Sequence, residues 1–387
     1  MFKIKTLNHV SDACLHHLPR DMYEMNDDVQ KPDAIFVRAC DMHGYDFAQE
    51  TLCIARAGIG VNTIPVDACT ERGITVFNTP GANANGVKEL FVFALGMASR
   101  DILGGMNWVY GYDAVGDSVE VAMEKIKKQF AGPEYFDKTL GVIGTGNVGS
   151  LVSNIALDLG MRVVAYDPYL SVDAAWKVSR NVERKRDLAS LFSECDYLTL
   201  HTPLTDETRD MICKANIEKM KDGVRIINYA RGEVVNEADI IEALNSGKVS
   251  SFVCDFPTAA LIKAKNCILT PHLGGTTIES EEKCAIMAAK QMTDYLENGN
   301  ITNSVNLPSV SLERMGSARI CVIHQNVPRM INRFLDLIGN ENINVEHMIN
   351  KPRGAVAYTI IDTGSPISAD IRSAIESMSE VMRVRVI

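Results

Sequence analysis

The chain has 387 residues, of which 46% are hydrophobic and 23% charged, so it is too long for one ordinary core and too well mixed to be disordered. Its formal net charge of -10 argues against nucleic acid or an anionic membrane as the main partner, because both call for clustered lysine and arginine. Ten cysteines at irregular spacings, with no Cys-x-x-Cys pair, predict reduced thiols rather than disulfides or a metal site. With no long apolar run, we expect a soluble cytoplasmic protein that acts on a small molecule.

Short apolar runs alternate with helical patterns along the first two thirds of the chain. The first three runs are DAIFVRA, TLCIARAG and GITVFNTPG, and their alternation predicts a parallel sheet with crossover helices. A long helical pattern then starts at Gly86. A second set of runs follows: KTLGVI, RVVAYDP, DYLTLHTP, VRIINYARG, SSFVCDF and CILTPH. We therefore predict an α/β fold with two doubly wound parallel-sheet domains.

The last seventy residues follow a different order. After the polar, proline-containing stretch ITNSVNLPSVSLERMGSA, the pattern reads strand, helix, two strands, helix and strand, from ARICVIH to MRVRVI. That order is ferredoxin-like, βαββαβ. Asn326 is a candidate N-cap for the first of its helices, with Pro328 in the first turn.

A glycine-rich loop, Gly144-Thr-Gly146-Asn147-Val148-Gly149, directly follows the apolar run TLGVI and opens a helical pattern. The next run ends in Asp167, eighteen residues past the third glycine. In this context the glycines let the backbone approach a pyrophosphate, and the carboxylate can accept hydrogen bonds from ribose hydroxyls. Because that carboxylate repels a 2'-phosphate, and Arg162 and Tyr166 form no obvious phosphate clamp, we predict NAD rather than NADP. A tight turn without a ligand is the alternative.

Two further residues follow apolar runs, at strand ends where ligands of doubly wound sheets bind: Arg231 in INYARGEVV and His272 in TPHLGG. An arginine fork can hold a substrate carboxylate, and a histidine can exchange the proton of an adjacent hydroxyl while a hydride leaves. Each taken singly has a plain structural explanation, an ion pair or a turn. Together they indicate oxidation of a 2-hydroxy acid.

At this point the sequence resembles the D-isomer specific 2-hydroxyacid dehydrogenases over essentially its whole length. The motifs that carry the resemblance are ARAGIGVNTIPVDAC, FNTPGANANGVKELFVFALG, KTLGVIGTGNVG, HTPLTDET, NYARGEVVNEADIIEAL and TPHLGG, followed by an ACT-type C-terminal segment. The resemblance implies that Arg231 binds the 2-oxo acid end and that His272 is the acid/base. It also implies contacts to NAD from Asp167, Thr202, Pro203, Ala230, Asp255, Gly274 and Gly275.

The resemblance further implies that Arg38, Arg56 and Gly58 face the substrate. A substrate with both a carboxylate and a phosphate needs more than one cation, which the three arginines would supply, although a strand-end arginine can also simply pair with a neighbouring carboxylate. The activity implied is oxidation of D-3-phosphoglycerate to 3-phosphohydroxypyruvate, the first step towards serine. The alternatives are a reductase of another 2-oxo acid, such as hydroxypyruvate or glyoxylate, and an NAD- or amino-acid-sensing regulatory protein without turnover.

The predicted domains are 1–82 with 278–306 for substrate binding, 83–277 for the Rossmann domain, 307–318 for a linker and 319–387 for the ACT-type domain. Members of the family form dimers through the nucleotide domain, so a homodimer or homotetramer is expected. ACT-type domains imply an amino-acid effector, with His324, Asn326 and Asn344 as candidate contacts. Arg329 replaces the small glycine that the family places there, which argues against serine feedback.

In the resembling family a glutamate pairs with the histidine, and here that position is Ala260. Three interpretations stay open: an unassisted His272 oriented by a backbone carbonyl or water, a carboxylate from elsewhere such as Glu279 or a partner subunit, or a protein that has lost catalysis. A carboxylate partner would fix the tautomer of the imidazole and aim its ring.

Overall fold

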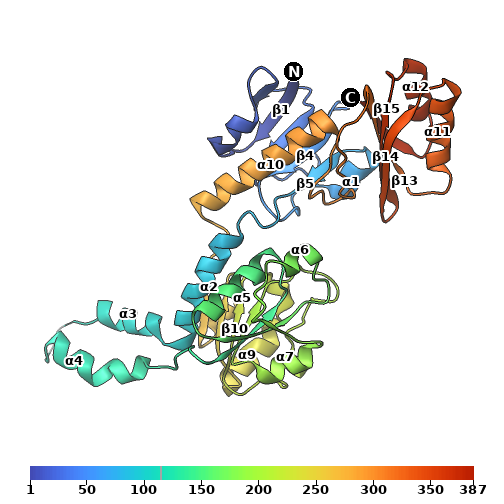
Figure 1. The fold of residues 1–387 in the computed structure, drawn as a ribbon. Helices are drawn as coiled ribbons and strands as arrows, with labels where there is room; N and C mark the ends of the chain where they lie inside the picture. Colours follow the sequence, from blue (N-terminus) through green and yellow to red (C-terminus); the bar gives the residue numbers. More distant parts are fainter. Residues whose placement is uncertain (114–115) are drawn as a thin grey trace. The chain divides into compact units, whose positions relative to one another are not determined.

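The computed structural model describes residues 1–113 and 116–387 and divides the chain into two compact units (Figure 1). The first comprises Met1–Ala82 with Glu281–Ile387, and the second comprises Asn83–Ser280. Within the described ranges, no helix combines the length and the apolar character that crossing a membrane requires. Each unit is built around its own parallel sheet, as the alternating pattern predicted.

The sheet of the first unit has five parallel strands in the order β2-β1-β3-β4-β5. Its strands are β1 Phe2–Leu7, β2 Tyr23–Asn26, β3 Ala34–Val37, β4 Cys53–Arg56 and β5 Thr75–Phe77, with η1 Asp12–His17 and α1 Val66–Glu71 among the connections. The last three strands were predicted. The first two were not, because β1 alternates lysine with apolar residues and buries only Ile4 completely, so it lacks a continuous apolar run.

The sheet of the second unit has seven parallel strands in the order β12-β11-β10-β9-β6-β7-β8, the order of a Rossmann fold. They are β6 Thr139–Ile143, β7 Arg162–Tyr166, β8 Glu183–Arg184, β9 Tyr197–Leu200, β10 Val224–Asn228, β11 Val249–Cys254 and β12 Cys267–Leu269. Six of the seven correspond to the predicted runs, and β8, with two exposed charged residues, was missed.

Helices cover both faces of this sheet. On one face α2 (Ala84–Ser99) and α5 (Asn147–Asp158) pack on strand residues such as Val142. On the other face α7 (Leu188–Glu194) and α9 (Glu237–Ser246) pack on residues such as Ile143. Short α6 (Val172–Ala175), α8 (Lys214–Ile217), η3 (Gly232–Val234) and η4 (Leu261–Lys263) complete the connections. Neighbouring strand residues therefore face opposite cores, which explains the continuous apolar runs.

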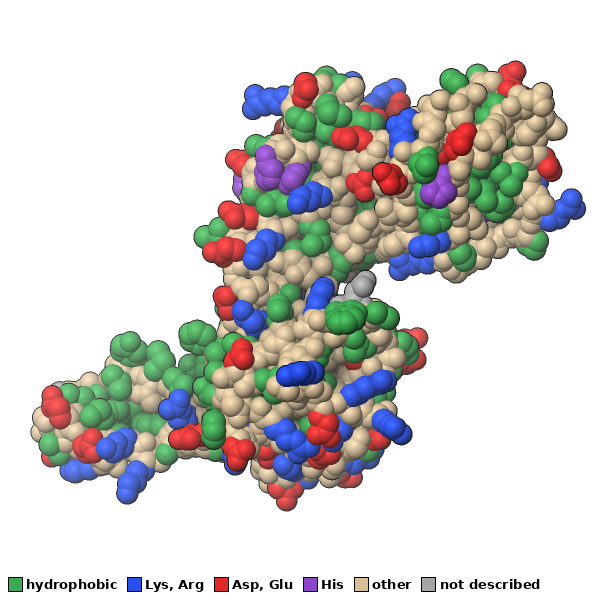
Figure 2. All heavy atoms as spheres, viewed as in Figure 1, with side chains coloured by type: hydrophobic (Ala, Val, Ile, Leu, Met, Phe, Trp, Pro, Cys, Tyr) green, Lys and Arg blue, Asp and Glu red, His purple; other side chains and the backbone are tan. Residues whose placement is uncertain are grey.

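The long helix predicted from Gly86 is two helices, because α2 ends at Ser99 and a new helix starts after Asp101. Asp101 accepts a hydrogen bond from the backbone N–H of Gly104 at 2.9 Å and so caps α3 (Ile102–Tyr110). Then α4 (Val119–Ile126) and η2 (Lys127–Phe130) follow. No residue of α3 or α4 is buried. Figure 2 shows the apolar side chains that these helices expose.

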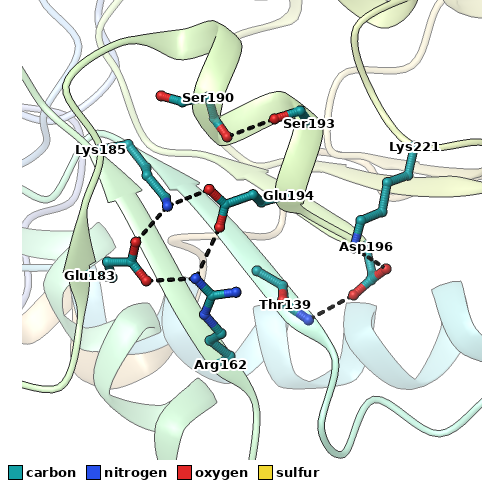
Figure 3. A network of polar contacts seen from close by, with 9 residues as sticks. All are labelled: Thr139, Arg162, Glu183, Lys185, Ser190, Ser193, Glu194, Asp196 and Lys221. Atoms are coloured by element: carbon teal, nitrogen blue, oxygen red, sulfur yellow. Dashed lines mark hydrogen bonds and ion pairs between the residues drawn. The ribbon is translucent and has the colours of Figure 1, made fainter.

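A network of charged side chains ties the short strand β8 to β7 and α7 (Figure 3). Arg162 donates to Glu183 at 2.6 Å and to Glu194 at 3.0 Å, and Lys185 contacts the same two carboxylates. Hydrogen bonds from Arg162, which has the larger effect, and from Lys185 lower the pKa of Glu183 to about 2. Both cations are therefore engaged in holding the sheet edge, and Arg162 is not available as a phosphate clamp.

The C-terminal segment forms an antiparallel four-stranded sheet in the order β14-β15-β13-β16, which confirms the ferredoxin-like prediction. Its elements are β13 Ala318–Gln325, α11 Met330–Asn340, β14 Val345–Arg353, β15 Val356–Thr363, α12 Ala369–Glu376 and β16 Val381–Val386. Asn326 is not the N-cap of α11, so that expectation is wrong. The helix starts four residues later, after Arg329, whose φ of 70° is a left-handed conformation that favours glycine.

The first unit joins this sheet to the five-stranded sheet through α10 (Ile278–Asn298). One apolar core contains Phe36, Tyr295 and Tyr358, from the two sheets and the helix. Arg385 of β16 donates to the carbonyls of Tyr295 and Leu296 at 2.9 and 2.7 Å. Because these carbonyls lie in the last turn of α10, the guanidinium satisfies orphan acceptors and complements the helix dipole.

Candidate active site

The predicted site residues of the second unit lie along one edge of its sheet. The glycine loop follows β6, Asp167 follows β7, Thr202 follows β9, Arg231 follows β10, and Asp255 and His272 follow β11 and β12. Because all seven strands run parallel, their carboxyl ends meet at the same edge, and the sheet order places β9 beside β6 at the point where the strand order reverses. Ligands of open α/β sheets bind at such a point.

The glycine loop is shaped by close backbone contacts. Gly144 has a φ of 85°, and a Cβ there would lie 2.6 Å from the carbonyl oxygen of His201. A Cβ on Gly149 would lie 1.9 Å from the carbonyl oxygen of Gly144, so α5 can approach β6 only with glycine at this position. A Cβ on Gly146 would meet nothing within 4 Å. The loop is thus closed on the sheet side and open at Gly146, where a pyrophosphate would need access to the N-terminus of α5.

Asp167 holds the same loop. Its Oδ2 accepts the backbone N–H of Thr145 at 2.8 Å, and its Oδ1 accepts the N–H of Tyr169 at 2.9 Å. A cavity of about 360 Å³ opens beside it, lined by Pro168, Val172, Trp176 and Arg184 among others. Arg184 was not singled out in the sequence, because β8 was missed. The Asp167 carboxylate lies at the position where ribose hydroxyls are bound in Rossmann folds.

Thr202 presents an unsatisfied polar atom next to the loop. Its Oγ1 is buried and has no hydrogen-bond partner among the described residues, and its methyl group lies beside Gly144. The preceding His201 is neutral, because burial lowers its pKa to about 3, and its Nε2 interacts with Thr199 Oγ1 at 3.0 Å. An open glycine, a carboxylate and an unpaired hydroxyl at one edge fit a dinucleotide.

Hydrogen bonds from the side chain of Asn228, the last residue of β10, hold the Arg231 loop. The Asn228 side chain accepts the N–H of Ala230 at 3.1 Å and donates to the carbonyl of Arg231 at 2.8 Å. Asn228 is completely buried, whereas Arg231 is half-buried and donates to the carbonyl of Ala230 at 2.6 Å. Asn228, which was not predicted from the sequence, thus holds the loop at the end of β10.

Asp255 organises the loop that carries His272. This carboxylate is 2% exposed and accepts the Thr270 hydroxyl at 2.6 Å and the N–H groups of Leu273 and Gly274 at 2.8 and 2.7 Å. The backbone N–H of His272 lies between these bonds and donates to the carbonyls of Asp255 and Thr270 at 3.1 and 3.0 Å. Asp255 was predicted as a cofactor contact, and its three hydrogen bonds give it a structural role in this loop.

Gly275, also predicted to contact NAD, lies against Asn83. A Cβ there would come 2.2 Å from Asn83 Nδ2, so no larger residue fits without displacing that side chain. His272 itself is exposed, with a φ of 55°, and its ring stacks edge-on against Phe256 with 5.1 Å between ring centroids. No carboxylate forms a hydrogen bond or ion pair with the His272 ring within residues 1–113 and 116–387. Neither Glu279 nor any other described acid fills the place of the absent glutamate.

Arg38 and Arg56, the predicted substrate arginines, lie together at the ends of β3 and β4 in the first unit. Arg56 Nε donates to the Arg38 carbonyl at 3.0 Å, and the Arg56 guanidinium lies over Gly58, where a Cβ would come 3.6 Å from its Cζ. Arg38 forms an ion pair with Glu281 of α10. No local pattern could point to Glu281, because the pairing joins residues 243 positions apart.

The predicted effector residues His324, Asn326 and Asn344 all have hydrogen-bond partners within the C-terminal segment. His324 is 2% exposed, and its ring nitrogens interact with Gln325 O and Thr359 Oγ1, both at 2.8 Å. The Asn326 amide donates to the Gly354 carbonyl, and the Asn344 amide donates to Glu346. The effector role of these residues stays a prediction.

Taken together, a sheet in Rossmann order, a glycine loop at its switch point and an arginine and a histidine on the same edge define a nicotinamide-dependent dehydrogenase. Residues 112–274 match the family model for the D-isomer specific 2-hydroxyacid dehydrogenase, NAD binding domain. The chain is 32% identical over 361 residues to D-3-phosphoglycerate dehydrogenase 1 of Saccharomyces cerevisiae, covering 86% of this chain and 72% of that protein.

Two further similarities broaden the comparison. The chain is 37% identical over 282 residues to a hydroxypyruvate reductase of Thermotoga maritima, covering 70% of this chain and 86% of that protein. The crystal structure of D-lactate dehydrogenase from Aquifex aeolicus, complexed with NAD and lactic acid, superimposes with a TM-score of 0.60 at 25% identity, covering 79% of this chain and all of that one. The chain belongs to the D-isomer specific 2-hydroxyacid dehydrogenases, and its cofactor is NAD.

Proposed function

We propose that this enzyme oxidises D-3-phosphoglycerate to 3-phosphohydroxypyruvate, with Arg231 and His272 as its catalytic residues. The observation that carries the proposal is the position of both residues at the cofactor edge of the second sheet, at the ends of β10 and β12. The similarity to phosphoglycerate dehydrogenases over most of the chain supports this substrate.

The proposed chemistry follows from the two side chains. The guanidinium of Arg231 binds the substrate carboxylate by paired hydrogen bonds. His272 takes the proton of the 2-hydroxyl group while the hydride on C2 leaves, so C2 is oxidised to a carbonyl and the proton stays on the imidazole. NAD, when bound, would supply the acceptor for this hydride. In the reverse direction the imidazolium returns its proton to the carbonyl oxygen.

The test is NADH formation from D-3-phosphoglycerate and NAD, for which we expect turnover. Equal kcat/KM for D-3-phosphoglycerate and D-glycerate in the unmodified enzyme would contradict the phosphorylated substrate.

Arg38→Ala is expected to raise KM for D-3-phosphoglycerate about 10- to 100-fold, because the charged hydrogen bond proposed between Arg38 and the substrate phosphate is lost.

A second candidate is reduction of hydroxypyruvate or glyoxylate. The similarity to a hydroxypyruvate reductase supports it, as does the ion pair between Arg38 and Glu281, which occupies one of the cations expected to bind phosphate. The comparison of D-3-phosphoglycerate with D-glycerate separates these two functions. A protein that binds NAD but turns over none of these substrates would support the regulatory alternative.

We further propose that two copies of the chain associate through α3 and α4. Ile102, Met106 and Val109 are 38%, 48% and 52% exposed and lie four and three residues apart, so they share one face of α3. Val109→Asp is expected to weaken self-association at least about 10-fold, because a charge would be buried against apolar surface. Sedimentation velocity checks this, with Ile262→Asp, at an exposed side chain of η4, as a control that leaves the mass unchanged. A Val109→Asp protein that keeps the mass of the unmodified protein contradicts the interface.

The ten cysteines are all free thiols, which supports a reducing compartment such as the cytoplasm for this reaction.

A further inference from the structure

The catalytic histidine has an aromatic neighbour where a carboxylate is expected. The ring of His272 meets Phe256 at 70°, with centroids 5.1 Å apart, in an edge-to-face arrangement. Pairs of this geometry are attractive, because the positive edge of one ring points at the negative face of the other. The His272 ring forms no hydrogen bond or ion pair within residues 1–113 and 116–387, so the ring pair with Phe256 is the side-chain interaction that restrains its orientation.

Phe256 is itself held in place. It follows β11, the strand that lies between β10 and β12, so it stands between the loops that carry Arg231 and His272. Its backbone N–H donates to Cys254 Sγ at 3.4 Å, and its side chain packs on the core formed with α7 and α9. Pro257 follows directly and restricts the backbone of Phe256.

The same side chain contacts the arginine loop. A Cβ on Gly232, the residue after Arg231, would lie 3.2 Å from Phe256 Cβ and 3.6 Å from its Cγ. Glycine therefore lets the arginine loop lie directly against the phenylalanine. One uncharged ring touches both the histidine and the residue next to the arginine, and it can set their spacing.

We propose that Phe256 is the positioning residue for His272, taking over from the absent glutamate the task of aiming the imidazole. The inference rests on the proposed function of His272 as the acid/base. An aromatic ring orients the imidazole without adding charge, whereas a carboxylate would also stabilise the imidazolium form. Phe256 then sets the orientation of the imidazole ring that accepts the hydroxyl proton. It does not stabilise the charged form of that ring.

The test compares two substitutions that differ in the ring. Phe256→Leu keeps an apolar side chain of similar size and removes the ring, and it is expected to lower kcat about 5- to 10-fold with KM for NAD unchanged. Phe256→Tyr keeps the ring and is expected to stay within about 2-fold of the unmodified kcat, because the edge-to-face contact remains. Phe252→Leu, a buried control in β11, the strand that precedes Phe256, and in the same core, is expected to leave kcat unchanged.

A readout without turnover keeps the two proposals distinguishable. In ¹³C-histidine-labelled full-length protein, assigned with His272→Asn, the His272 ring signal is expected to move in Phe256→Leu and to stay in Phe256→Tyr, because the ring-current contribution of Phe256 is lost only in the first. An unmoved signal, or equal losses of kcat in Phe256→Leu and Phe252→Leu, would overturn the positioning role. A signal that moves in a protein without dehydrogenase activity would retain the contact and reject the proposed function instead.

Discussion

His272→Asn is expected to lower kcat for D-3-phosphoglycerate oxidation by about three orders of magnitude, because the substrate hydroxyl loses its proposed proton acceptor in the step that releases the hydride. The side chain is exposed at the cofactor edge, so its removal opens no cavity. Asparagine also accepts the left-handed backbone at φ 55° better than most residues, so the loop held by Asp255 should persist. Initial rates of NADH formation measure the effect.

The control is cofactor affinity. NADH fluorescence titration should give a Kd within about 2-fold of the unmodified enzyme, since only a group in the proton transfer has been changed. A His272→Asn enzyme that retains a tenth or more of the normal kcat would mean that another group accepts the proton.

Arg231→Lys keeps the positive charge but loses the two-pronged guanidinium. We therefore expect it to raise KM for the substrate and to lower kcat/KM about 10- to 100-fold.

The largest effect on stability is expected at a buried ion pair in the C-terminal sheet. Arg319 of β13 and Asp362 of β15 are both 0% exposed and lie opposite each other, joined by two hydrogen bonds of 2.6 and 2.8 Å. Arg319 also donates to the carbonyls of Asn298 and Leu312, at 2.7 and 3.0 Å. Arg319→Met should lower the free energy of unfolding of the first unit by about 3–5 kcal/mol, because it leaves a carboxylate buried without its partner.

Urea denaturation followed by circular dichroism measures this loss, since both tryptophans, Trp108 and Trp176, lie in the second unit and do not report on the first. The double variant Arg319→Met/Asp362→Leu should recover a large part of the loss, because no charge is then left buried. Arg314→Met, which removes an exposed side chain bonded to Ile387 O, serves as the control and should change stability by less than about 0.5 kcal/mol. A double variant no more stable than the single one would assign the loss to packing.

Apolar runs predicted most of the fold because the strands of both parallel sheets are buried on two faces and so carry a continuous signal. The signal failed where burial is partial, as in β1 and β8. The expected start of α11 was wrong for another reason. The polar residue Asn326 suggested a helix cap, whereas the helix begins after Arg329. Arg319 lies within a run that indicated only an apolar strand. Its partner Asp362 could not be predicted, because it lies 43 positions away in the chain.

The sequence by itself determined the order of the elements, the glycine loop and the placement of Arg231 and His272 at strand ends, because these depend on local periodicity and on short spacings along the chain. It could show that the glutamate is absent, but not what lies beside the histidine instead. That was decided by the sheet order, which inserts β11 between β10 and β12 and so brings Phe256 against His272 and Gly232. Such neighbours come from strand pairing across the sheet, and no local pattern encodes which strand will lie next to which.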